Sequence, residues 1–413
     1  MKSPDLHIVG AFCFYIVKAF QNQVLVMIIT PADRLQQVEE YYFSSKLAEI
    51  KQMNARGLDV INLGIGSPDL PPHRAVIDLL THTAQQANSH AYQSYVGIDE
   101  LREAMTEWYE QVYQVRLSPH GEVLPLMGSK EGIMHISMAF LNPGDGVLVP
   151  NPGYPTYLSV ARLVHARVLP YLLDEQNDWE PDWEQLEQMD LNGVKLMWVN
   201  YPNMPTGAKA SEAVFERLVA FAHRHKILVV NDNPYSLILN GTPRSILQTP
   251  GAMEVALELN SLSKSHHLAG WRVGMLLGRA DYLRCVLQVK SNMDSGMFLG
   301  IQKAAAFAMR HCREDWHVEQ NGHYEKRLEL AQQIALLLGC SLPSEGTGLF
   351  LWVKAPDMVN DVGQWADELL YNHRVFITPG MVFGSAGARY LRLSLCCTEN
   401  RLREAFVRLG GKL

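Results

Sequence analysis

Short apolar segments alternate with amphipathic helical segments through the middle of the chain. The apolar segments cover residues 147–149, 196–199, 227–230, 255–259 and 273–277. Strands that are apolar at every position are typical of a parallel sheet buried on both faces. Each segment is therefore predicted to be a strand of such a sheet.

Residues 211–226 lie between two of these strands and have the pattern of an amphipathic helix. Their apolar side chains recur at helical spacing behind Ser211, which is a good N-cap residue. This strand–helix–strand order predicts an α/β domain over residues 75–304. Residues 31–74 and 305–413 are rich in helical patterns, with strands expected near 349–353 and 390–395. A second, smaller domain built from both ends of the chain is therefore predicted.

Residues 1–30 form an atypical N-terminal extension. Residues 8–17 are apolar, but polar residues follow at once, and a bilayer span needs about 20 apolar residues. The run has the length of a signal-peptide core, yet no clear cleavage site follows it. Two interpretations remain: a weakly membrane-associating segment, or an upstream extension of a reading frame whose working start is Met27. The second is favoured.

Composition and charge exclude several classes of function. The chain has 413 residues, a net charge of −7 and a pI of about 6.1, so no basic face for nucleic acid is expected. The six cysteines show neither CxxC nor zinc-site spacing, which is typical of reduced cytosolic thiols and favours the cytoplasm. His266 and His267 are adjacent and cannot easily face one ion, so no metal site is expected.

Lys264 is the most informative residue of the chain. It follows the predicted strand 255–259 in the run Ser261-Leu-Ser-Lys-Ser, and Arg272 lies downstream. Burial and nearby cations favour a neutral amine, which can attack an aldehyde and form a Schiff base. Serine hydroxyls and arginine bind phosphate well. An aldehyde that carries a phosphate is pyridoxal phosphate, although a surface lysine in a polar loop fits this run equally well when it is taken alone.

Other polar motifs also follow predicted strands, where ligands bind in α/β sheets. Gly128-Ser-Lys-Glu-Gly132 precedes a helical run and predicts an anion site at the helix N-terminus. Tyr154 could present its ring for stacking. Asp232 ends a strand and is a natural partner for a protonated pyridine nitrogen, or else a helix-capping residue. Tyr235 could donate to the phenolic oxygen of the cofactor.

Taken together, the motifs resemble the class I/II aminotransferases, which are pyridoxal-phosphate enzymes of fold type I. The resemblance covers about residues 35–409. The motifs that carry it, in the order of the family, are Leu63-Gly-Ile-Gly-Ser-Pro-Asp69, Tyr92-x4-Gly97-x3-Leu-Arg102, Gly128-Ser-Lys-Glu-Gly132, Asn151-Pro-Gly-Tyr154, Pro205-Thr-Gly207, Asp232-x2-Tyr235, Ser261-x-Ser-Lys264-x7-Arg272 and Tyr390-Leu-Arg-Leu-Ser394. Two of them, GSKEG and NPGYP, resemble the diaminopimelate and alanine aminotransferase branch.

The resemblance implies a fold and a set of roles. The fold is a three-layer α/β/α domain with a mostly parallel sheet, plus a smaller α+β domain. Lys264 binds the cofactor aldehyde and moves the substrate proton. The other implied cofactor contacts are Asp232 at the pyridinium, Tyr235 at the phenolic oxygen, Tyr154 on the ring, and Ser129, Lys130, Ser261, Ser263 and Arg272 around the phosphate. Arg392 and the backbone of Gly66 hold the substrate carboxylate. Tyr92 reaches the phosphate of a neighbouring subunit, which implies a homodimer with shared sites.

One position departs from the family pattern. The family has asparagine directly before Pro-Thr-Gly, where its amide bonds the phenolic oxygen, and this chain has Met204 there. Methionine offers no comparable donor, so the pKa of the Lys264–cofactor linkage is expected to rise. Asn203, one residue earlier, is a candidate replacement.

The implied activity is amino transfer between an L-amino acid and a 2-oxo acid. A carbon–sulfur β-lyase on cystathionine-like substrates is the nearest alternative, because it uses the same cofactor. A non-catalytic PLP-binding regulatory protein is a second alternative, which the full set of Lys264, Asp232, Tyr235 and Arg392 disfavours. The amino donor cannot be read from the sequence.

Overall fold

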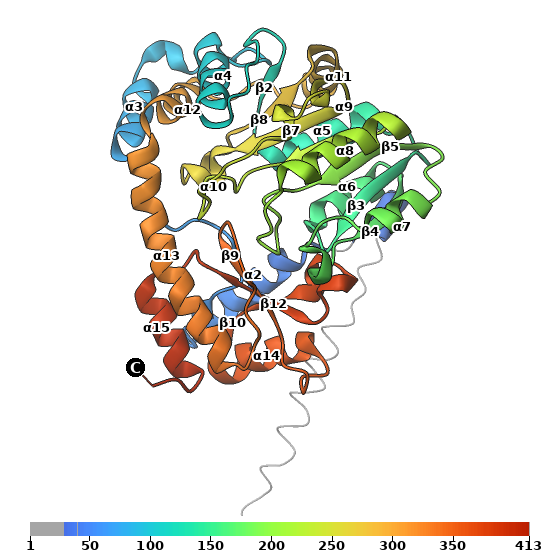
Figure 1. Ribbon diagram of the computed structural model, residues 1–413. Helices are drawn as coiled ribbons and strands as arrows, with labels where there is room; N and C mark the ends of the chain where they lie inside the picture. Colours follow the sequence, from blue (N-terminus) through green and yellow to red (C-terminus); the bar gives the residue numbers. More distant parts are fainter. Residues whose placement is uncertain (1–28, 39, 413) are drawn as a thin grey trace, which may run out of the picture.

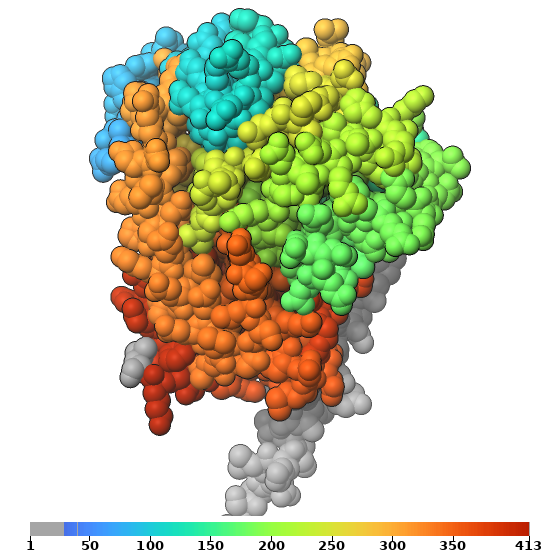
Figure 2. Space-filling model, in the orientation of Figure 1, coloured from blue at the N-terminus to red at the C-terminus, as the bar shows by residue number. Residues whose placement is uncertain are grey.

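The computed structural model describes residues 29–38 and 40–412, so most of the N-terminal extension predicted for residues 1–30 lies outside the described residues. The described chain forms two packed units, a large one around a sheet and a smaller one built from both ends of the chain (Figure 1). Figure 2 shows the two units in contact, with the orange and red C-terminal segments against the green and yellow middle of the chain. Among the described residues, no helix is both long and apolar enough to cross a membrane.

The large unit is built on a seven-stranded sheet with the order β2-β8-β7-β6-β5-β3-β4. Its strands are β2 (Val123–Leu126), β3 (Gly146–Asn151), β4 (Arg167–Leu172), β5 (Val194–Val199), β6 (Leu228–Asp232), β7 (Ala256–Ser261) and β8 (Gly274–Gly278). The predicted strands in the middle of the chain are confirmed, and β3 to β7 pair in parallel as expected.

Helices cover both faces of this sheet, because each central strand is apolar on both sides. In β6, Val230 packs with α5 (Ser129–Phe140), α6 (Pro155–Leu163) and α11 (Ala280–Lys290). The preceding residue, Val229, points to the other face of the sheet and belongs to the core there. That core is formed with α3 (Arg74–Ala84), α4 (Asp99–Tyr113), α7 (Trp183–Gln188), α8 (Glu212–His225) and α12 (Leu299–His311). The predicted three-layer α/β/α arrangement is confirmed.

The helix expected over residues 211–226 is α8, and its N-cap is the predicted one. The Ser211 side chain accepts a hydrogen bond from the backbone N of Val214. The remaining short helices of the large unit are α9 (Ala252–Val255), α10 (Leu262–Ser265) and the 3-10 turns Ala87–Ser89, Glu175–Asn177, Ile246–Gln248 and Ala269–Trp271. Of these, α10 matters most, since it carries Lys264 directly after β7.

One predicted strand, β8, runs in the opposite direction to the others. It pairs antiparallel with both β7 and β2. Only residues 262–273 separate β7 from β8, which is the lower limit of length for a crossover between parallel strands. Its reversed direction brings the amino end of β8 to the sheet edge where the parallel strands end.

The sequence patterns missed the two edge strands, β2 and β4. Each contains a proline, Pro125 in β2 and Pro170 in β4, and β4 also exposes Arg167. Proline is tolerated at sheet edges, where one side of the strand needs no ladder hydrogen bond. These strands therefore lack the continuous apolar pattern that marks the central ones.

The smaller unit joins segments from both ends of the chain. Strand β1 (Ile61–Asn62) pairs in parallel with β10 (Val375–Phe376), and a three-stranded sheet has the order β11-β12-β9. Those strands are β9 (Phe350–Lys354), β11 (Thr378–Pro379) and β12 (Tyr390–Ser394). The helices are α2 (Tyr42–Ala55), α13 (Glu314–Leu337), α14 (Val362–His373) and α15 (Glu399–Arg408), with 3-10 turns at Gly380–Phe383 and Ser385–Gly387. The 3-10 turn Asp33–Gln37 instead packs on α6 of the large unit.

The boundary between the units near residue 304 stays a prediction, and the packing favours a later position. Residue 304 falls within α12, whose buried face packs on α3 and α4 in the large unit. Helix α13 then passes from one core to the other. Its Trp316 belongs to the core of the large unit, whereas Tyr324 belongs to the core of the smaller unit. We therefore propose that the boundary lies within α13.

Candidate active site

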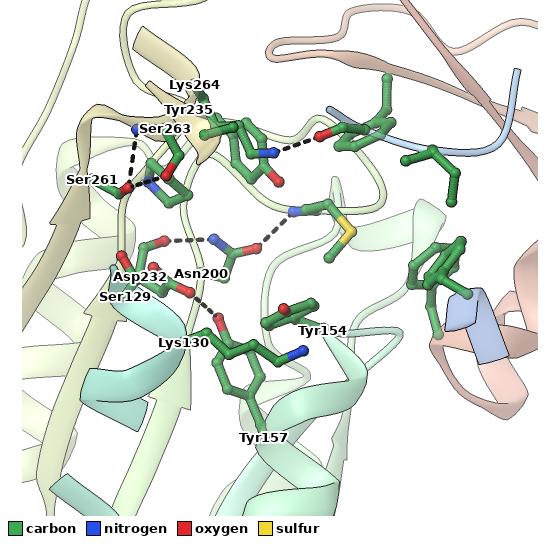
Figure 3. A pocket seen from close by; sticks show the side chains of 18 of the residues that line it. Ser129, Lys130, Tyr154, Tyr157, Asn200, Asp232, Tyr235, Ser261, Ser263 and Lys264 are labelled. Atoms are coloured by element: carbon green, nitrogen blue, oxygen red, sulfur yellow. Dashed lines mark hydrogen bonds between the residues drawn. The ribbon is translucent and has the colours of Figure 1, made fainter. Parts of the chain in front are cut away.

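The predicted site residues meet at one edge of the large sheet, in a cavity of about 500 Å³ against the smaller unit. Strands β2, β3, β5, β6 and β7 all end at this edge, which places Ser129, Tyr154, Asn200, Asp232 and Ser261 around it. Arg272 also lies there, because it precedes the reversed strand β8. Figure 3 shows Lys264 with Ser261, Ser263 and Tyr235 on one side of the cavity, and Tyr154 and Tyr157 on the other.

Lys264 points into the cavity from α10. Its Nζ donates a hydrogen bond to the backbone oxygen of Gly66, which comes from the smaller unit. Desolvation lowers the pKa of Lys264, and the positive charges of Arg392 and Arg272 act in the same direction, although Cys396 opposes them. The amine is therefore shifted toward the neutral, nucleophilic form.

Asp232 is buried at the end of β6, with 5% of its surface exposed. Only one of its two carboxylate oxygens has a hydrogen-bond partner among the described residues. Its Oδ2 accepts from the Tyr157 hydroxyl at 2.8 Å, while Oδ1 is buried without a hydrogen-bond partner among the described residues. Burial raises the pKa of Asp232 to about 7, and repulsion from Glu258 adds to this, whereas the Tyr157 bond lowers it. A cationic N–H group opposite the free oxygen would stabilise the ionised form of this buried carboxyl.

The walls beside Asp232 include two residues that the sequence analysis did not single out. Asn200 Nδ2 donates to the backbone oxygen of Asp232, and its Oδ1 accepts from the Met204 backbone N at 2.8 Å. Tyr157 lies three residues after Tyr154, which places both on one face of the start of α6. Strand-end position and helical spacing are the sequence signals that could have identified them.

A candidate anion site lies beside Lys264, at the N-terminus of α5. Ser261 Oγ and Ser263 Oγ are 2.8 Å apart, and Ser129 lies across from them. A Cβ atom on Gly128 would stand 2.1 Å from Arg272 Nη2, so the guanidinium packs directly on the glycine backbone. The helix N-terminus, the hydroxyls and the arginine match the chemistry that binds a phosphate group.

Arg392 is the buried cation at the far end of the cavity, on β12. Its Nη2 donates to the Gly64 oxygen at 2.6 Å and its Nη1 to the Met204 Sδ at 3.1 Å. Nε has no hydrogen-bond partner among the described residues. Desolvation lowers the pKa of Arg392 to about 10, so the group remains charged at neutral pH. A buried guanidinium with a free donor is suited to bind a carboxylate.

Of three further predicted contacts, Lys130 lines the cavity, whereas Asn203 and Tyr92 do not. Asn203 does not line the cavity, because its Oδ1 accepts from the Thr206 hydroxyl at 2.8 Å. The Lys130 amine lies 4.2 Å from the centre of the Tyr41 ring, at the cavity wall away from the serines. Tyr92 is 91% exposed and does not contact the site of its own chain.

A separate cluster of buried polar groups links α5 to the segment after α11. Glu131, His135 and Asp294 bring ligand atoms within 4.8 Å of one another. Lys290 Nζ donates to Asp294 at 2.7 Å, and the Met127 backbone N donates to Glu131 at 2.7 Å. Because Lys290 already places a positive charge inside the cluster, these residues form an ion-pair network between the two segments.

The family model for aminotransferase class I and II matches residues 58–409. A protein named LL-diaminopimelate aminotransferase from Oleidesulfovibrio alaskensis is 38% identical over 92% of this chain and 99% of its own length. One of the same name from Aquifex aeolicus is 36% identical over 92% of this chain and 98% of its own length.

Solved structures show the same similarity. BacF from Bacillus subtilis, in its apo form, has a TM-score of 0.88 at 33% identity, covering 93% of this chain and 98% of that one. An aspartate aminotransferase from Thermus thermophilus with maleate has a TM-score of 0.86 at 25% identity, covering 92% and 99%.

Proposed function

The chain belongs to the class I and II aminotransferases, and on this premise we propose that Lys264, Asp232 and Arg392 carry its reaction. It is a pyridoxal-phosphate-dependent enzyme of fold type I that moves an amino group between an amino acid and a 2-oxo acid. When bound, the cofactor supplies an aldehyde that takes up the amine and a ring that withdraws electrons from the α-carbon. The observation that best supports these roles is the free Oδ1 of Asp232, in the same cavity as Lys264 and Arg392.

The residues of the large unit would hold the cofactor. Asp232 Oδ1 would accept from the protonated ring nitrogen, and its negative charge would keep that nitrogen protonated. Ser129, Ser261, Ser263 and Arg272 would bind the phosphate. Tyr154 would cover the ring and Tyr235 would donate to the phenolic oxygen, since both line the cavity. We assign no cofactor contact to Asn203.

Lys264 and Arg392 would act on the substrate. The guanidinium of Arg392 binds the α-carboxylate and thereby sets the position of the α-carbon. Lys264 Nζ, shifted toward its neutral form by desolvation, would take the proton from that carbon and pass it to the former aldehyde carbon of the cofactor. The Gly66 oxygen, which accepts from Nζ, keeps the amine directed into the cavity.

Met204→Asn is expected to lower the pKa of the Lys264–cofactor linkage by about one to two units. An asparagine amide could donate to the phenolic oxygen, and hydrogen bonds to charged groups contribute about 1.5–3 kcal/mol. Titrating the absorbance of the purified holoenzyme with pH measures this value. Met204→Leu is the matched control, because it keeps the apolar side chain and adds no donor. An unchanged pKa in Met204→Asn would show that this position does not tune the cofactor.

We propose a homodimer with shared sites, in which Tyr92 reaches the phosphate of the partner. The almost complete exposure of Tyr92 in the single chain supports this. A Lys264→Ala homodimer and a Tyr92→Ala homodimer would each be impaired at both sites. A dimer with one subunit of each variant has one intact site, because that site takes Lys264 from one subunit and Tyr92 from the other. Mixing equal amounts after dissociation should restore about a quarter of wild-type activity, since half the dimers are hybrids. No restoration would argue against shared sites.

We also propose a cytoplasmic location. The cysteines in the described part of the chain are all free thiols, which agrees with a reducing compartment. Cell fractionation followed by immunoblotting tests this proposal, and recovery in a membrane or extracellular fraction would contradict it.

A panel of amino donors with 2-oxoglutarate and pyruvate as acceptors tests the activity. The holoenzyme is expected to form one new amino acid for each 2-oxo acid that it releases from the donor. LL-diaminopimelate belongs in the panel, because the relatives carry that name. Cystathionine belongs there too, since a β-lyase would release pyruvate and ammonia from it without any acceptor. That outcome would show that the enzyme catalyses elimination rather than amino transfer.

A further inference from the structure

The two sides of the cavity differ in chemistry. The groups from the large unit are mostly polar or charged, as the cofactor requires. The smaller unit contributes an apolar wall around Arg392, which consists of Tyr41, Phe43, Leu47, Ile65, Phe350 and Phe383. The side of the cavity that holds the substrate carboxylate is therefore lined by aromatic and aliphatic side chains.

Three phenylalanine rings enclose the guanidinium of Arg392. Its Cζ lies 3.9 Å from the ring centre of Phe350, 4.5 Å from that of Phe383 and 5.3 Å from that of Phe43. The carboxylate of a bound amino acid therefore comes to rest among these rings, and its side chain starts only two bonds away. The substrate side chain must then lie close to the same apolar wall.

Phe350 is held rigidly in this wall. A Cβ atom on Gly66 would stand 2.1 Å from Phe350 Cζ, so the ring packs directly on the glycine backbone. The ring also packs edge-on against Tyr235, with centroids 5.9 Å apart. A close-packed ring cannot move aside for a hydrated polar group, so this surface discriminates by desolvation.

Within a single chain, the charged groups of the cavity offer little to a second polar end of the substrate. The cations that line it in the described chain are Lys130, Lys264, Arg272 and Arg392, and the one anion is Asp232. Asp232 faces the proposed ring nitrogen, so a distal ammonium group would meet positive charge without a carboxylate to pair with. Lys130 is exposed, and an exposed cation adds little affinity for a distal carboxylate.

We propose that this site selects amino acids with an apolar or aromatic side chain over dicarboxylic and diaminodicarboxylic ones. The proposal rests on amino transfer as the function and on Arg392 as the carboxylate anchor. Each methylene buried against the wall should raise affinity about fourfold. A distal charge buried there should lower it by at least about tenfold.

Equilibrium binding to the holoenzyme tests the wall without turnover. Propionate, butanoate, pentanoate, hexanoate and 3-phenylpropionate are titrated against succinate and glutarate, and the cofactor absorbance reports binding. Affinity is expected to rise about fourfold per methylene in the monocarboxylates, with each dicarboxylate at least about tenfold weaker than the monocarboxylate of equal chain length. Equal or tighter binding of the dicarboxylates would overturn the proposal.

Turnover separates this proposal from the function on which it rests. The ratio kcat/KM is measured for 2-aminobutyrate, norvaline, norleucine and phenylalanine, and for aspartate, glutamate and LL-diaminopimelate. Transfer from the last three but not from the apolar donors would refute the selectivity and leave the aminotransferase intact. No transfer from any donor, with the monocarboxylate series unchanged, would refute the function and leave the apolar wall intact.

Leu47→Arg tests whether the wall itself sets the selectivity. Leu47 lines the cavity from α2 and is 42% exposed, so an arginine can be accommodated. The variant is expected to increase the affinity for glutarate relative to hexanoate about twofold to fivefold, the usual contribution of an ion pair that is partly open to solvent. Leu336→Arg is the matched control, because Leu336 is exposed on α13 and does not line the cavity. An unchanged ratio in a folded Leu47→Arg protein would contradict the assignment of this wall to the substrate.

Discussion

Lys264→Ala is expected to reduce amino transfer by at least about ten-thousandfold, because the same amine binds the cofactor aldehyde and moves the substrate proton. Removing it takes away both the covalent attachment and the base. The measurements are kcat with the best donor and the pH-dependent absorbance of the cofactor, which depends on the covalent linkage. Both are expected to be lost in the variant.

The control for this change is Lys326→Ala, since Lys326 is exposed on α13, away from the cavity. It should retain wild-type activity. Unfolding temperatures of both variants show whether they are folded. The substitution should reduce the stability of the fold only slightly, because Lys264 makes a single hydrogen bond to the Gly66 oxygen. Burying its amine also costs free energy, and the variant avoids this cost. A folded Lys264→Ala protein with appreciable turnover would refute the assignment.

Lys264, Asp232 and Arg272 could be found from sequence because each lies at the end or start of a strand with a clear apolar pattern. A parallel sheet brings its strand ends together at one edge, so neighbours in space follow from order along the chain. The reversed direction of β8 was not apparent in its own residues. The short segment between β7 and β8 was the available signal, and it is what places Arg272 opposite Ser129.

Contacts that depend on the direction of an individual side chain could not be predicted from the sequence. Asn203 and Met204 are adjacent, yet the first bonds Thr206 and the second turns toward Arg392. Two successive residues differ in direction because of the local backbone, which no periodic pattern describes. The same holds for the apolar wall, since its members come from α2 and the residue before it, the loop after β1, β9 and the turn at Gly380–Phe383, far apart in the sequence.

Asp232→Asn is expected to lower kcat by about a hundredfold to a thousandfold, the usual effect of removing one preorganised electrostatic contact. The replacement keeps the shape and can keep the bond with the Tyr157 hydroxyl, so the buried strand end should remain folded. What it removes is the negative charge that holds the ring nitrogen protonated. Activity near the wild-type level would show that this charge is not required.

The stability of the cofactor-free protein gives a second, independent readout of Asp232. Burial raises the pKa of Asp232 from 3.8 to about 7 in the folded chain. As the pH rises, the unfolded chain therefore releases this proton at a lower pH than the folded chain does. The folded state loses stability between these two pKa values, 3.8 and about 7. The loss is on the order of 4 kcal/mol above pH 7 for a fully buried group. The Asp232→Asn variant has no ionisable carboxyl group at this position, so its stability lacks this pH dependence.

Without cofactor, Asp232→Asn should therefore be more stable than the wild type at pH 8, and the difference should shrink toward pH 4. Pyridoxal phosphate is expected to reverse the order at pH 8, because only the wild-type carboxylate gains a cationic partner there. Urea unfolding at both pH values, with and without the cofactor, measures all four differences. A difference that does not change with pH would show that Asp232 is not the buried, unpaired acid that the geometry indicates.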